Sequence, residues 1–125
     1  MEIDADEIKK EKGHNMLLQK IHAERQHIRD LLVALKQGRA LAETYAKQIS
    51  RYKWQRKAIQ RLKTEGVHIE NADALYITAD RKCNAAKWGY ANATLRIRVV
   101  KEKIKNAQRR LSRLSAKFKA QSSEE

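Results

Sequence analysis

The chain has 125 residues, a size typical of one domain, with no proline and only four glycines. Ala, Leu, Ile, Lys, Arg, Glu and Gln dominate, which favours helix over strand. A formal net charge of +13 indicates an anionic partner, either nucleic acid or an acidic protein surface. No apolar run is long enough to cross a bilayer and the start MEIDADEIKK is acidic, so we expect a cytoplasmic protein without membrane insertion.

The first predicted helix covers residues 4–64. Asp4 followed by Glu7 resembles a capping box, and acids in a first turn suit the positive end of the helix dipole. Gly13 is a candidate break, which would separate a short N-terminal helical segment.

An apolar stripe with heptad spacing begins at Leu17. Ten of its thirteen positions are apolar, and the exceptions are Glu24, Gly38 and Arg56. Gly38 marks either a bend or a close helix contact. The positions of this first stripe are Leu17, Ile21, Glu24, Ile28, Leu31, Leu35, Gly38, Ala42, Tyr45, Ile49, Tyr52, Arg56 and Ile59.

A turn is predicted at residues 65–71, where Gly66 fits a helix stop and Asn71 fits an N-cap. A second helix is predicted at 72–119, and residues 120–125 lack periodicity, so we expect them to be disordered.

The second helix carries a stripe in which every position is apolar or aromatic and large residues alternate with mostly alanine. We expect Cys83, the single cysteine, to pack there and not to be reactive. The second stripe comprises Ala72, Tyr76, Ala79, Cys83, Ala86, Tyr90, Ala93, Ile97, Val100, Ile104, Ala107, Leu111, Leu114 and Phe118.

A short connection makes neighbouring helices antiparallel, so the predicted fold is all-α, a long antiparallel coiled-coil hairpin. Residue numbers of facing positions then add to 135, which pairs Gly38 with Ile97 and Tyr45 with Tyr90. In this register Glu24 lies beside Arg110 and Arg56 beside Asp80. Each long side chain either reaches the rim to pair with that neighbour or forms a buried polar layer that sets the register.

Basic residues form two groups. Thirteen Lys/Arg and one acid lie between Arg81 and Lys119, and six cations and no acid lie between Arg51 and Lys63. The facing flank of the first helix carries no acid opposite Arg96, Lys103, Arg110 and Lys117, so we expect this basic row to lack a counterion within the chain. Either these charges are solvated and keep a long hairpin soluble, or they contact phosphates or an acidic protein. Binding of an anionic partner is predicted for Arg51, Lys53, Arg56, Lys57, Arg96, Arg98, Lys101, Lys103, Arg109, Arg110, Arg113 and Lys117.

Three large apolar residues, Trp54, Trp88 and Leu95, fall on outer positions of the heptads. They are predicted to dock a protein partner or, for the tryptophans, to stack on bases. The alternative is that the N-terminal segment folds back over them or that hairpins associate through them.

The histidines do not fall at metal-ligand spacing, and no phosphate loop or catalytic constellation occurs, so we expect neither an enzyme nor a cofactor or metal site.

Length, the basic hairpin and the aromatic cluster Tyr52-Lys53-Trp54-Gln55 shortly before Gly66 resemble the small coiled-coil stalk proteins of flagellar and virulence-type type III secretion export machines. The resemblance covers Leu17 to Phe118. It implies a docking protein, similar to the shaft of rotary ATPases, that sits in a hexameric export ATPase ring, promotes its assembly or activity and handles chaperones. The alternatives are a small helical nucleic-acid-binding subunit and a homo-oligomeric scaffold.

Overall fold

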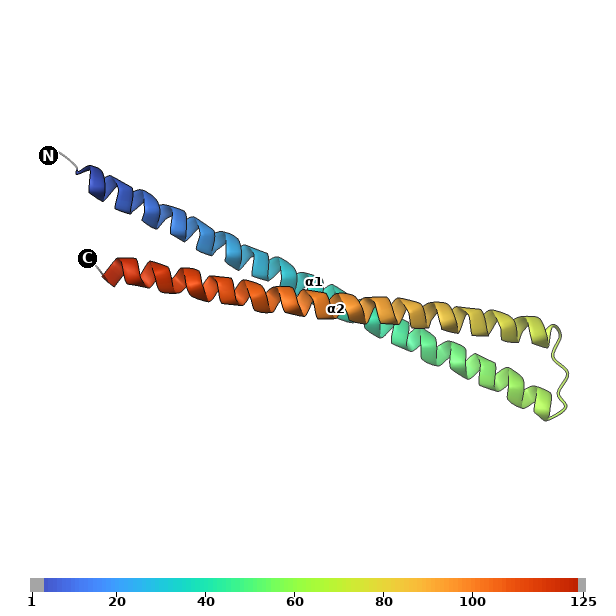
Figure 1. Cartoon of the computed structure of the whole chain (residues 1–125). Coiled ribbons are helices and arrows are strands. Elements are labelled where there is room, and N and C mark those ends of the chain that lie inside the picture. Colours follow the sequence, from blue (N-terminus) through green and yellow to red (C-terminus); the bar gives the residue numbers. More distant parts are fainter. Residues whose placement is uncertain (1–3, 124–125) are drawn as a thin grey trace. The chain divides into compact units, whose positions relative to one another are not determined.

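The computed structural model describes residues 4–123 and contains two helices, α1 (Ala5–Thr64) and α2 (Ala72–Ser123). They pack against each other as a helical hairpin, and no strand occurs in the described part of the chain (Figure 1). The predicted all-α hairpin is therefore confirmed.

Both ends of α1 follow local signals in the sequence. The Asp4 side chain accepts a hydrogen bond from the backbone N–H of Asp6, as an N-cap does. At the other end Gly66 has a φ of 79°, its N–H donates to the Lys63 carbonyl, and the Val67 N–H donates to the Leu62 carbonyl. This pair of bonds is the Schellman motif, which satisfies the last carbonyls of the helix, so the predicted stop at Gly66 is confirmed.

At the start of α2 the backbone carbonyl of Asn71 accepts the first hydrogen bond of the helix. The Leu75 N–H donates to the Asn71 carbonyl at 2.9 Å, and Asn71 has a φ of 57°. Asparagine is among the few residues with a side chain that tolerate this left-handed conformation. Asn71 therefore lies where the N-cap was predicted, and its identity also suits the bend of the chain.

Neither early glycine interrupts α1, which is one continuous helix through Gly13 and Gly38. The separate N-terminal segment that we predicted is therefore absent from the described residues. A Cβ at Gly38 would lie 3.2 Å from Cγ1 of Ile97, whereas a Cβ at Gly13 would meet nothing within 4 Å. Gly38 thus permits a close helix contact, and its predicted pairing with Ile97 is confirmed.

The predicted disordered tail is wrong for residues 120–123, because α2 continues to Ser123. The hydroxyl of Ser122 donates to the Phe118 carbonyl and that of Ser123 to the Ala120 carbonyl, each at 3.0 Å. Ser122 also lies 3.3 Å from Nε2 of His14 on α1. These bonds extend the helix beyond the last apolar position, and residues 124–125 lie outside the described part.

The packing falls into two compact units, each containing a part of both helices. The terminal unit comprises Met1–Leu35 and Val99–Glu125, and the turn unit comprises Lys36–Arg98. Size alone had predicted one domain.

Every buried residue in the described chain belongs to one of the two predicted apolar stripes. In the terminal unit these are Ile21, Leu31, Leu35, Ile104 and Ala107, so branched aliphatic side chains dominate. In the turn unit they are Ala42, Ala79, Cys83, Ala86 and Ala93. Cys83 is 0% exposed and free, which agrees with the predicted packing role.

The prediction places two large rings, Tyr45 and Tyr90, at one layer of the hairpin, and Gly89 provides the space for one of them. A Cβ at Gly89 would lie closer than 3.0 Å to the ring of Tyr45, so the ring occupies the space that a side chain at position 89 would need. Tyr90 is exposed. The two rings therefore do not compete for one layer, because Gly89 accommodates one of them.

Candidate docking surface

Positive charge is concentrated in the turn unit. This unit has fourteen Lys/Arg and five Asp/Glu, a net +9, whereas the terminal unit has fourteen and ten, a net +4. Of the predicted anion-binding residues, the turn unit holds Arg51, Lys53, Arg56, Lys57, Arg96 and Arg98. The terminal unit holds Lys101, Lys103, Arg109, Arg110, Arg113 and Lys117. Six of the twelve therefore lie in each unit, and the predicted basic row that runs from Arg96 to Lys117 is divided between them.

Four of the five acids in the turn unit already have a basic partner. Glu43 pairs with Lys47 at 3.4 Å and Glu65 with Arg61 at 3.2 Å. Asp73 pairs with Lys63, and Asp80 with Arg56. Among residues 4–123 no ion pair involves Arg51, Lys53, Lys57, Arg96 or Arg98, and all five are exposed. These cations are therefore accessible to an external anion.

Two of the predicted anion-binding residues have counterions within the hairpin. Arg110 donates to Oε1 of Glu24 at 3.0 Å, so the expectation that the basic row lacks an internal counterion is wrong at this position. Arg56 donates to Oδ1 of Asp80, and this bond raises the pKa of Arg56 above its ordinary value. The guanidinium thus stays charged but is already neutralised, and Arg56 is half-buried.

These two ion pairs show how the hairpin accommodates Glu24 and Arg56, the charged residues in its apolar stripe. Glu24 and Arg56 are half-buried, and no fully buried charged residue occurs within residues 4–123. Each side chain reaches the rim and pairs with the neighbour that the register predicted. The rim interpretation is therefore confirmed over the buried polar layer.

The two tryptophans are exposed but do not form one cluster. Trp54 is 70% exposed and Trp88 is 73% exposed, and Leu95 is also exposed. Trp88 lines a depression with Asn84, Lys87 and Ala91, all from α2. Trp54 lines different depressions, which share no residue with that of Trp88. The N-terminal part of α1 is continuous with the rest of that helix from Ala5 onward.

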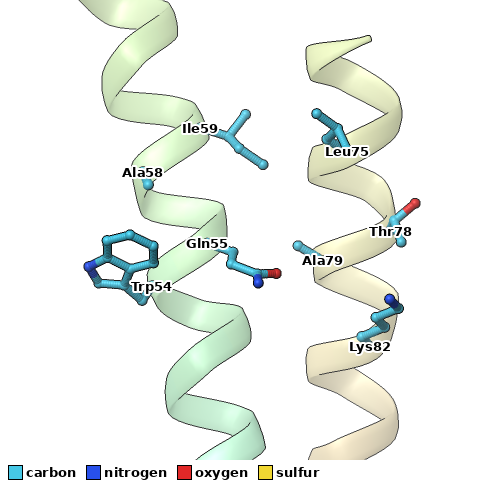
Figure 2. Close-up of a pocket in the computed structure, with 8 residues that line it drawn as sticks. All are labelled: Trp54, Gln55, Ala58, Ile59, Leu75, Thr78, Ala79 and Lys82. Atoms are coloured by element: carbon cyan, nitrogen blue, oxygen red, sulfur yellow. The ribbon is translucent and has the colours of Figure 1, made fainter. Parts of the chain in front are cut away.

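The groove beside Trp54 lies between the helices near the turn and has a volume of about 360 Å³ (Figure 2). Gln55 and Ile59 point from α1 toward α2, and Leu75 and Ala79 point toward α1. Trp54 stands at the outer margin of α1. Thr78 and Lys82 form the α2 side, and Ala58 completes the lining. We call these eight residues the turn groove.

Sequence reasoning identified only Trp54 of the turn groove as a functional residue. The available signal was that Leu75 is large and apolar yet lies outside the two stripes. Lys82 is held at the edge of the groove, where its Nζ lies 5.9 Å from the ring centroid of Tyr52. The groove therefore combines an apolar floor with a positioned cation.

No group of three or more His, Cys, Asp or Glu side chains within residues 4–123 is arranged to hold a metal ion. Neither described helix contains an apolar segment of the length that a bilayer crossing requires. No protein-family model, curated protein or solved structure matches this chain. The resemblance to export-machine stalk proteins therefore stays a prediction.

Proposed function

We propose that the protein is a non-enzymatic docking hairpin that binds an acidic surface of a larger protein assembly through its turn unit, in the cytoplasm. One observation carries the proposal. The turn unit has a net charge of +9, and four of its five acids are already paired internally. A surface with unneutralised cations and exposed aromatic side chains supports binding to an anionic protein, because aromatic anchors and complementary charge favour such interfaces.

A stalk in a hexameric export ATPase ring is one form of this docking. Trp54 and Lys53, which belong to the aromatic cluster that carries the resemblance, are both exposed in the turn unit. Such a stalk would bring the turn unit or the helix ends against the ring.

Nucleic-acid binding is the second candidate, favoured by the exposed indole of Trp54 close in sequence to the exposed cations Lys53 and Lys57. Bases stack on exposed aromatic rings while cations neutralise phosphates. Such binding would be sequence-independent and would weaken steeply with salt.

The experiment is affinity capture from the native host with the tagged full chain, with and without nuclease treatment. A variant in which Arg51, Lys53 and Lys57 are changed to Glu tests the surface. The control carries the same three changes at Lys9, Lys10 and Lys12 of the terminal unit. Protein docking predicts an acidic partner that survives nuclease, is lost in the first variant and is retained in the second.

Loss of all captured material after nuclease treatment would contradict protein docking and favour the second candidate. In that case the purified protein should retard a labelled single-stranded oligonucleotide at low salt, and the first variant should not.

A further inference from the structure

The turn groove contains apolar surface that the hairpin does not cover. Ala58 and Ala79 have small side chains, and Ile59 and Leu75 point toward each other from the two helices (Figure 2). Leu75 is 48% exposed although it is a large apolar residue. Covering such surface is favourable by about 25 cal/mol per Å² of apolar area removed from water.

A second depression adjoins the groove and shares part of its lining. It has a volume of about 560 Å³ and is lined by Trp54, Lys57, Ala58, Arg61, Leu62 and Glu65. Trp54 and Ala58 line both depressions, so the exposed indole stands between them. Tryptophan is among the residues most often found as energetic anchors of protein interfaces, so Trp54 is suited to such a role.

The dimensions of this surface fit an α-helix. The lining residues on α1 extend from Trp54 to Leu62, which corresponds to roughly 12 Å at 1.5 Å per residue, or about two turns of a parallel helix. A helix laid in a groove contacts it through residues spaced three and four apart, so its apolar stripe would cover the floor.

Charge decides which helix is compatible. Each depression has a lysine in its lining, Lys82 in the turn groove and Lys57 in the second one, and the one acid of this surface, Glu65, already pairs with Arg61. The unit as a whole has a net charge of +9, so the turn unit of a second copy would bring charge of the same sign. Complementarity therefore favours a partner helix with acidic side chains on both flanks of its apolar stripe.

We propose that the turn groove binds an acidic amphipathic α-helix of a partner protein, with Trp54 as the anchor. This inference rests on the proposed protein-docking function and adds the chemistry of the partner and the place where it binds. In the complex a third helix lies along α1 and α2 near the turn, and its carboxylates face Lys57 and Lys82.

The two tryptophans make the site directly observable. Replacing Trp88 by Phe leaves Trp54 as the only tryptophan, and replacing Trp54 by Phe leaves Trp88. The probe is a synthetic helical peptide without tryptophan, with Leu at the heptad a and d positions and Glu at e and g. Titration of the Trp88→Phe protein should shift the Trp54 emission to shorter wavelength and saturate. The Trp54→Phe protein should show no change in Trp88 emission.

A pair of matched variants tests the groove itself. Leu75 lines the groove, whereas Ile77, which is 51% exposed on the same helix, does not. Each is changed to Glu in the Trp88→Phe background, so both variants gain one negative charge. Leu75→Glu should weaken peptide binding by at least about tenfold, as loss of a central contact does, and Ile77→Glu by less than about threefold. Circular dichroism confirms that both variants remain helical.

Three results would overturn the inference. The first is that both Glu variants weaken peptide binding equally. The second is that a control peptide with Lys in place of Glu binds as tightly as the acidic peptide. The third is that the Trp54 emission shifts with protein concentration alone, which would identify a second copy of the chain as the occupant. One result distinguishes failure of this inference from failure of the proposed docking function. If Leu75→Glu still captures a nuclease-resistant acidic partner from the host, docking stands and the groove is not its site.

Discussion

The terminal unit and the turn unit are built from the same heptad pattern but bury different side chains. Leucine and isoleucine fill most of the core of the terminal unit, whereas alanine and Cys83 fill that of the turn unit. The turn unit also has the larger net charge and both tryptophans, which are exposed. The comparison indicates that small core residues allow the helices to approach closely in the turn unit, where both tryptophans remain exposed.

The largest expected effect tests the difference between the cores. Ile104→Ala removes a buried branched side chain from the terminal unit and should lower the free energy of unfolding by about 2–4 kcal/mol. Cys83→Ala removes a single heavy atom from the turn unit and should lower it by about 1 kcal/mol. Urea unfolding followed by circular dichroism measures both values, and equal losses would show that the two cores contribute alike.

The next effect concerns the contact between Tyr45 and Gly89. Gly89→Ala forces the Tyr45 ring to move and should lower the free energy of unfolding by about 1–2 kcal/mol, despite the better helix propensity of alanine. The matched control is Gly13→Ala, where the added Cβ meets nothing within 4 Å. It should raise stability by about 0.5–1 kcal/mol.

A double variant shows whether the tyrosine ring is the cause. In a Tyr45→Ala background, Gly89→Ala should no longer destabilise, because the space beside position 89 is empty. An unchanged loss in that background would show that the ring is not what position 89 accommodates.

The smallest effect is expected at the rim of the terminal unit. Glu24→Gln keeps the shape of the side chain but removes the charge that faces Arg110, and the pair is partly exposed. The loss in unfolding free energy should stay below about 1 kcal/mol and shrink further at high salt. A larger loss that is independent of salt would indicate that Glu24 acts through packing.

Periodicity predicted most of the fold. A repeat of seven residues identifies the face that each helix buries, and every buried residue between positions 4 and 123 belongs to the two stripes. The register also placed Glu24 near Arg110 and Arg56 near Asp80, because a shared period aligns every layer once one is aligned. Gly66 marked the end of α1 because few other residues adopt its positive φ.

What the sequence did not predict depends on the directions of individual side chains. The ring of Tyr45 takes the space beside Gly89, and only the packed helices show that this space exists. The helical residues 120–123 are held by serine hydroxyls bonded to backbone carbonyls, which no apolar pattern reports. The turn groove arises because small residues from both helices lie beside Trp54, and those residues are distant in sequence.

The connection between the helices limits how such a hairpin can change in length. Gly66 and Asn71 both require a positive φ, at either end of a short connection, so the path of the chain there is closely defined. One residue inserted into α2 would rotate everything after it by about 100° and turn the apolar stripe away from α1. Longer or shorter natural forms are therefore expected to differ by whole heptads, gained or lost in both helices together, with the connection unchanged.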